Sequence, residues 1–156
     1  MTGEFILCGA FLYLCAAWII WLSSYMAPAL VDQNDAQPLE TGVKFRSALP
    51  GWITHLRFYK GASDGGTHVG HLWSASGSLL ATAGFTGETA SGWQEVALPS
   101  PVAIAANTTY VASYHTRARY AYTSGYFAEP VSDPPLIAER SLYRYGKTAF
   151  PEASSA

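Results

Sequence analysis

The chain has 156 residues, with 9 Lys and Arg against 11 Asp and Glu, a formal net charge of −2, and 49% hydrophobic residues. A nearly neutral chain without a basic run lacks the positive surface needed to bind nucleic-acid phosphates, so we expect neither DNA nor RNA as a partner. Both cysteines, Cys8 and Cys15, lie in one apolar N-terminal stretch. The rest of the chain therefore has no thiol for a disulfide, a zinc site or nucleophilic catalysis.

The first predicted element is a transmembrane helix. The segment Phe5–Met26 contains no charged residue, no proline and no histidine, and about 20 apolar residues are enough to cross a bilayer as a helix. A cleaved secretory signal is the alternative, because Ala27-Pro28-Ala29 has the small-x-small pattern of a cleavage site. The tip before Phe5 has no Lys or Arg and the apolar run is long for a signal, so we favour a retained anchor at 1–26.

The predicted helix has two unlike faces. Small residues recur every seven positions on one face, and bulky residues occupy the other. The first face would pack against other membrane helices through Gly9, Leu12, Ala16 and Ser23. The second would face lipid or pigment through Phe11, Leu14, Trp18, Trp21 and Tyr25. An alternative is that the aromatic residues form an interfacial belt and that the spacing of the small residues is chance.

An aperiodic polar segment, 27–41, follows and is predicted to be a linker or an extended arm. The pattern then changes to short β-type runs separated by Gly, Pro, Ser and Asn, which predicts one antiparallel β-sandwich, jelly-roll or immunoglobulin-like, over 42–147. The expected strands are Val43–Ser47, Trp52–Tyr59, His68–Ser74, Leu79–Phe85, Gly92–Leu98, Thr109–Thr116, Tyr120–Phe127 and Leu136–Tyr145. Residues 148–156 are expected to be a flexible tail.

Alternation within the predicted strands assigns their faces. In the predicted strand Trp52–Tyr59, the core face should contain Trp52, Leu56 and Phe58. In Thr109–Thr116, one face should contain Tyr110, Ala112 and Tyr114, and the other Val111, Ser113 and His115. Each strand is thus expected to have one core face and one wetter face.

Three runs of residues carry a family resemblance: Gly51–Gly61 (GWITHLRFYKG), Gly66–Trp73 (GTHVGHLW) and Leu79–Ala83 (LLATA). Phe85–Gln94 (FTGETASGWQ), Pro101–Ile104 (PVAI) and Thr109–His115 (TYVASYH) extend it. Over Val43–Phe127 the chain resembles a bacterial domain family of unknown function. The resemblance implies a β-sandwich module of exported and cell-surface proteins, often placed beside carbohydrate-active or adhesion domains.

The order of helix, arm and single sandwich also resembles a small accessory subunit of a bacterial phototrophic reaction-centre and antenna complex. That resemblance implies integral membrane protein subunits as partners and, because the helix has no histidine ligand, only apolar contact with lipid, chlorophyll or carotenoid. Lys44 and Arg46 alone weakly favour a cytoplasmic domain. The family resemblance implies instead a single-pass protein of the bacterial inner membrane with a periplasmic domain.

Candidate metal ligands are sparse. His68 and His71 are three residues apart, which places them on opposite faces of a strand, so structural roles are favoured for these and for His55 and His115. Asp64-Gly65-Gly66-Thr67 is interpreted as a glycine-rich turn. Asp64 would serve calcium only if Glu88 folded against it. We therefore predict no metal site, with Asp64 and Glu88 as a weak candidate.

Tyrosines near the C-terminal end of the predicted sandwich are the main candidate interface. Tyr120, Tyr122 and Tyr126 share a parity and are flanked by Arg117 and Arg119, and Tyr and Arg are over-represented at protein interfaces. An exposed aromatic platform would equally suit a sugar. No nucleophile motif, phosphate loop or convergent carboxylate pair is present, so we expect no enzyme. The sequence predicts a membrane-anchored accessory subunit that stabilises a larger membrane complex, or alternatively a membrane-tethered carbohydrate or cell-surface binding module.

Overall fold

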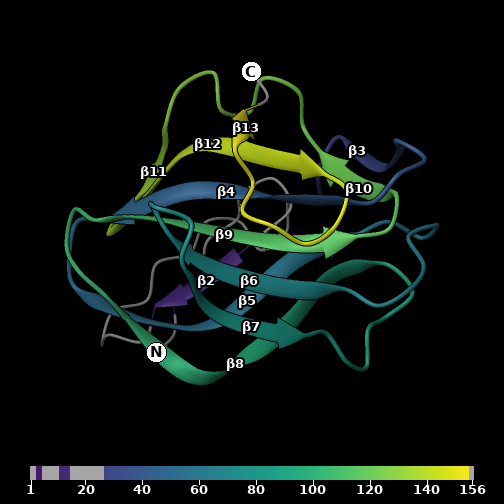
Figure 1. Ribbon diagram of the computed structural model, residues 1–156. Coiled ribbons are helices and arrows are strands. Elements are labelled where there is room, and N and C mark those ends of the chain that lie inside the picture. The colour runs from purple at the N-terminus through teal and green to yellow at the C-terminus, as the bar shows by residue number, and fades with distance from the viewer. Residues whose placement is uncertain (1–2, 5–10, 15–26, 155–156) are drawn as a thin grey trace.

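The computed structural model describes residues 3–4, 11–14 and 27–154, and these residues form strands and turns (Figure 1). The strands are β1 (Gly3–Glu4), β2 (Phe11–Leu14), β3 (Leu30–Asn34), β4 (Leu39–Ser47), β5 (Gly51–Lys60), β6 (Val69–Ser74), β7 (Leu79–Gly84), β8 (Gly92–Ile104), β9 (Thr109–Thr116), β10 (Arg119–Tyr122), β11 (Val131–Asp133), β12 (Leu136–Tyr145) and β13 (Ala153–Ser154). The all-β prediction for the sandwich region is confirmed.

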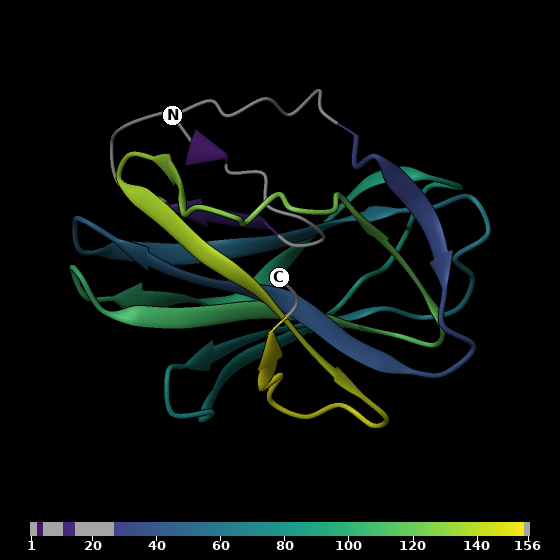
Figure 2. The ribbon, with the colours of Figure 1, turned by 90° about the horizontal axis from the view of Figure 1, so that it is seen from above.

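The strands form three sheets, and every pairing between them is antiparallel. The largest sheet has the order β11-β12-β4-β9-β6-β7, with β13 added to β12. A second sheet has the order β1-β2-β5-β8, and β10 pairs with β3 in a small third sheet. Seen from above, β12 and its neighbour β4 run across the molecule and β3 lies at one end (Figure 2).

The hydrophobic core lies between the largest sheet and the β5–β8 pair. The Phe58 ring of β5 stacks on Tyr114 of β9 with ring centroids 4.4 Å apart, and it meets the edge of Phe85 at 4.8 Å. Val43 and Phe45 of β4 are fully buried in the same cluster. Burying large aromatic and branched side chains from both sheets supplies the apolar contact area that holds the layers together.

The predicted core face of β9 is confirmed, but one assignment in β5 is wrong. Tyr110, Ala112 and Tyr114 all enter the core. In β5 the ladder with β8 is irregular between Ile53 and His55, which shifts the alternation by one residue. Ile53 is therefore buried, whereas Trp52 is 49% exposed.

The outer face of the largest sheet is also partly covered, so the wetter second face predicted for β9 is wrong at Val111 and Ser113, each 1% exposed. Val111 packs with Trp73 and Leu142 in a second small cluster. Phe150 completes this cluster, with its ring 5.9 Å from that of Trp73. The segment 148–154, expected to be a flexible tail, thus packs on the sandwich and supplies β13.

The N-terminal part of the domain also differs from the expected linker. Residues 27–41 contain β3 and the start of β4. Strand β3 is part of the fold because it pairs with β10, where Gln33 lies opposite Tyr120. The polar composition of this segment suits an exposed two-stranded ribbon as well as an arm. Strands β4 to β10 and β12 overlap the eight predicted runs, although β10 ends at Tyr122 instead of Phe127.

Most of the predicted membrane helix lies outside the described residues. Within Phe5–Met26 the structure describes Phe11–Leu14, which form β2 and pair with β5. Gly9, Ala16, Trp18, Trp21, Ser23 and Tyr25 belong to the part that is not described. In the described ranges, no helix is long and apolar enough to cross a membrane. The helix over the whole segment stays a prediction.

Candidate functional site

A tyrosine-rich pocket lies on the inner face of β4 and β12, at the end where β10 covers them. Its volume is about 290 Å³. The lining residues are uncharged and come from β4, β10, β12 and the segment after β10: Leu39, Thr41, Tyr120, Ala121, Tyr122, Thr123, Ser124, Gly125, Tyr126, Phe127, Ser141, Tyr143 and Tyr145. In Figure 1 the chain between β10 and β11 arches above β12 at the top of the molecule.

Strand register places one wall of the pocket. Tyr143 lies opposite Thr41, and Tyr145 lies opposite Leu39, in the β12–β4 ladder. Because alternate residues of a strand share a face, both tyrosines are directed to the same side. Their ring centroids are 5.5 Å apart at an interplanar angle of 70°, the edge-to-face geometry that aromatic pairs favour.

Strand β10 and the following turns form the other wall. The rings of Tyr120 and Tyr122 lie 5.7 Å apart, and those of Tyr126 and Phe127 lie 5.2 Å apart at 87°. Tyr126 N–H donates to Thr123 C=O, which closes a turn that brings Tyr126 back towards β10. The positive φ of 68° at Gly125 is a conformation that glycine adopts without a steric cost.

Asp35 anchors two of the pocket tyrosines. Its Oδ2 accepts hydrogen bonds from the hydroxyls of Tyr145, at 2.7 Å, and Tyr120, at 3.1 Å, while Oδ1 accepts from Gln33 Nε2 at 3.0 Å. Burial opposes ionisation of Asp35, but the bonds from Gln33 and the two tyrosines outweigh it and lower the pKa of the carboxyl. Asp35 therefore remains a carboxylate beside the pocket at neutral pH.

The same contacts keep the two hydroxyls protonated. Hydrogen bonding to Asp35, aided by burial, raises the pKa of Tyr145 to about 12. Burial and the bond to Asp35 also raise the pKa of Tyr120. Both groups donate their proton to Asp35 and expose a hydroxyl oxygen as an acceptor.

The structure brings together the three predicted tyrosines but not the two arginines. Arg119 donates from Nη1 to the Asp32 carbonyl at 3.2 Å, and the Arg117 side chain lies over Gly66. Neither lines the pocket. The sequence prediction missed Tyr143 and Tyr145, although their i, i+2 spacing at the end of a predicted strand was a usable signal.

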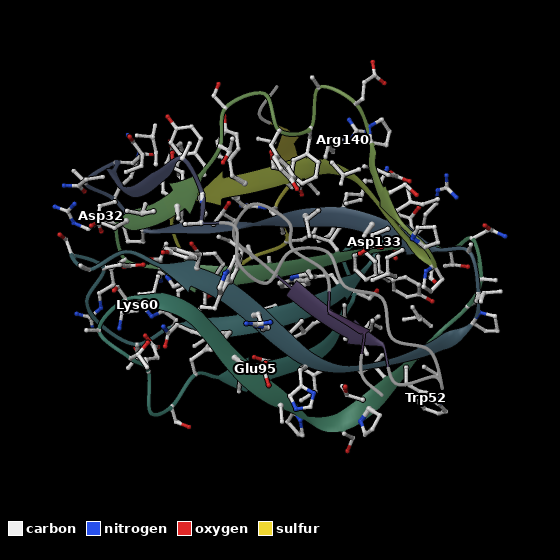
Figure 3. The ribbon with its side chains drawn as sticks, turned by 180° about the vertical axis from the view of Figure 1, so that it is seen from behind. Asp32, Trp52, Lys60, Glu95, Asp133 and Arg140 are labelled. Atoms are coloured by element: carbon white, nitrogen blue, oxygen red, sulfur yellow. The ribbon has the colours of Figure 1, made fainter. Side chains whose placement is uncertain are left out.

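Asp64 and Glu88, the weak metal candidate, do converge, but on a histidine. His68 Nδ1 lies 2.9 Å from Glu88 Oε2, and Nε2 lies 3.2 Å from Asp64 Oδ2. Lys60 and Trp52 lie at the two ends of β5 (Figure 3). The Nζ atom of Lys60 lies 2.8 Å from Glu88 Oε2. Thr116 Oγ1 donates to Asp64. Both carboxylates are thus engaged by protein hydrogen-bond donors, and among the described residues no group of His, Cys, Asp or Glu side chains has an arrangement that could hold a metal ion.

The charge states in this network support each other. Burial alone would lower the pKa of His68, but contacts with Asp64 and Glu88 outweigh it and raise that pKa. Burial would raise the pKa of Glu88, but its bonds to Lys60 and His68 outweigh this and lower it. The network is an ion-pair cluster that joins β5, the residues before β6 and the segment before β8.

A second buried carboxylate, Glu40, lies on the outer face of the largest sheet. It is 0% exposed and accepts hydrogen bonds at Oε1 from Ser113 Oγ and, at 2.8 Å, from His71 Nδ1. His115 Nδ1 lies 3.6 Å from Oε2, and Trp73 Nε1 donates to Ser113 Oγ. Ser113 and His71 both bind the carboxylate, so they do not form a nucleophile–base pair. These contacts join β4, β6 and β9.

The fold and the pocket define a class: an antiparallel β-sandwich domain with a concave aromatic site at one end. The family follows from comparison with known proteins. Residues 25–156 match the family described as Domain of unknown function (DUF4082), and the chain belongs to that family. Searches of curated proteins and of solved structures find no match.

Proposed function

We propose that this chain is a non-catalytic binding module and that the tyrosine pocket binds a sugar. The observation that carries the proposal is the concentration of five tyrosines and Phe127 around one concavity with no charged lining side chain. Aromatic rings pack against the C–H faces of a sugar, and the hydroxyls of tyrosine, serine and threonine can exchange hydrogen bonds with sugar hydroxyls. A pocket with a volume of about 290 Å³ can hold one or two sugar rings, whereas a protein partner usually needs a broader contact surface.

The other polar clusters support a non-catalytic role. The His68 and Glu40 clusters consist of buried groups already engaged with each other. Neither cluster contributes a residue to the pocket lining. General acid–base catalysis works best with a group whose pKa lies near the working pH. The lining offers only tyrosine, serine and threonine hydroxyls, and the pKa values of Tyr120 and Tyr145 are raised further from neutrality.

A second candidate is an accessory subunit of a membrane complex, for which the resemblance described above implies photosynthetic subunits as partners. The observation that favours it is the uncharged segment Phe5–Met26, whose composition fits a membrane helix. In that case the domain would be periplasmic, and a segment of a partner protein would occupy the tyrosine pocket. Protease protection in spheroplasts tests this placement, since a protected domain would contradict it.

The decisive experiment measures sugar binding to the full chain by glycan array and then by titration calorimetry. Tyr122→Ala removes a ring from the pocket, and Tyr59→Ala is the matched control because Tyr59 packs against Trp93 on β5 and β8. We expect Tyr122→Ala to abolish binding and Tyr59→Ala to retain it, with circular dichroism confirming that both variants fold.

Binding that survives Tyr122→Ala would contradict the pocket assignment. If no sugar binds, purification in mild detergent followed by mass spectrometry tests the second candidate. A reproducible set of co-migrating membrane subunits, reduced by Tyr122→Ala, would support the accessory role. A chain that migrates alone would refute that role.

A further inference from the structure

One negative charge lies beside the pocket, and none of the lining residues carries a balancing positive charge. Asp35 is held within hydrogen-bond distance of Tyr120 and Tyr145, which both line the pocket. Arg119, although adjacent to Tyr120 in sequence, is directed to the Asp32 carbonyl. Among the lining residues and Asp35, which binds two of them, the Asp35 carboxylate therefore carries the only formal charge, beside six aromatic rings.

We infer that the pocket selects a ligand that carries a positively charged amino group, and that Asp35 is the residue that determines this selectivity. For the sugar-binding role proposed above, on which this inference rests, the ligand class is an amino sugar with a free amine. An N-acetylated sugar or a uronic acid would be disfavoured.

The hydrogen-bond polarity of the site fits such a group. An ammonium group has three donors and no acceptor. Tyr120 and Tyr145 direct their protons to Asp35 and so offer oxygen acceptors, and the carboxylate itself attracts the positive charge. An anionic ligand needs donors, which these two hydroxyls do not provide.

The aromatic lining adds a second attraction. The faces of tyrosine and phenylalanine rings attract cations within about 6 Å, an effect that grows as water is excluded. Tyr143 and Tyr145 meet edge to face, as do Tyr126 and Phe127, so rings with different orientations surround the cavity. Aromatic cages that bind quaternary ammonium groups use the same attraction between a cation and the faces of several rings.

The test compares three probes by titration calorimetry with the full chain at pH 6: an oligomer of glucosamine, the matching N-acetylglucosamine oligomer, and an oligomer containing glucuronate. Asp35→Asn removes the charge but keeps an oxygen acceptor for the tyrosines. Glu152→Gln is the matched control, because Glu152 is exposed and lies 3.6 Å from Arg144 away from the pocket. A salt titration of the wild-type chain gives a readout that needs no variant.

We expect the glucosamine oligomer to bind about three to five times more tightly than its N-acetylated form at low salt, the range for one partly exposed charge pair. The ratio should approach one in Asp35→Asn and at high salt, and persist in Glu152→Gln. A ratio unchanged in Asp35→Asn, or a preference for glucuronate, would overturn the inference while leaving a sugar pocket in place. If none of the three probes binds, the inference fails, and the sugar-binding role fails with it only if the glycan array also shows no binding.

Discussion

Replacing His68 by glutamine should destabilise the fold most between about pH 4.5 and pH 6.5. These limits are the ordinary pKa values of a glutamate, 4.5, and a histidine, 6.5, which we take for the unfolded chain. The raised pKa of His68 means that its charge stabilises the fold fully below about 6.5, and that this contribution disappears as pH rises through the raised value. The lowered pKa of Glu88 stabilises the fold above about 4.5, and that contribution is lost as pH falls through the lowered value.

The magnitude follows from what His68 touches. Its side chain is 1% exposed, is held between Asp64 and Glu88, and packs with its ring centroid 4.6 Å from that of Phe58. Removing one partner of a buried ion pair costs about 3–5 kcal/mol. Glu88 keeps Lys60 at 2.8 Å, so the lower end applies. We expect a loss of about 3 kcal/mol at pH 5.5, or roughly 10 °C in Tm for a domain of this size.

The assay is urea unfolding of the full chain at pH 5.5 and pH 9, followed by tryptophan fluorescence. Above the raised pKa the wild-type imidazole is neutral and donates one N–H to a carboxylate. Because the glutamine amide can donate a similar bond, the difference between wild type and His68→Gln should fall to about 1 kcal/mol or less. His55→Gln, a change at a half-buried position outside this network, is the control and should have a small effect at both pH values. An equal loss for His68→Gln at both pH values would refute the ion-pair reasoning.

Two further substitutions test the packing. Gly42→Ala would place a Cβ against the Ala112 carbonyl oxygen, closer than real Cβ atoms approach other atoms, so we expect a loss of at least about 2 kcal/mol by urea unfolding. Gly84→Ala has open space around its Cβ and should cost under about 1 kcal/mol; similar losses for the two variants would contradict the close pairing of β4 with β9. Phe150→Ala removes the ring that covers Trp73, which should cost about 1–2 kcal/mol and make the C-terminal segment more sensitive to protease; unchanged digestion would show that this segment is not held by Phe150.

Local alternation predicted most of the sandwich because most strands have a strongly apolar face. Tyr110, Ala112 and Tyr114 illustrate the success, since every second residue of β9 enters the core. Trp52 illustrates the failure, because the irregular ladder beside it depends on β8, which is distant in sequence. Strand β3 was missed because its pairing with β10 leaves no residue of β3 fully buried, so its sequence needs no apolar face.

The candidate site was predicted only in part, for a related reason. Tyr120, Tyr122 and Tyr126 form a local pattern and were found from it. Asp35 lies 85 residues before Tyr120 and 110 before Tyr145, and it acts on the pocket only through tertiary contact. A single charged residue after a short strand has no local signal that separates it from an ordinary turn residue.

The pocket and the hydrophobic core lie at opposite ends of the same pair of strands, β4 and β12. Near Phe45, the inner face of β4 packs in the core cluster, while farther along the same face Leu39 and Thr41 line the pocket. Strand β12 follows the same course, from Ala138 in the core to Tyr143 and Tyr145 at the pocket. The geometry of the site is therefore held by a ladder whose other end is fixed in the hydrophobic core, which favours a preformed site. Variation in ligand preference would then arise mainly from β10, its following turns and the Asp35 loop, which can change without disturbing the core.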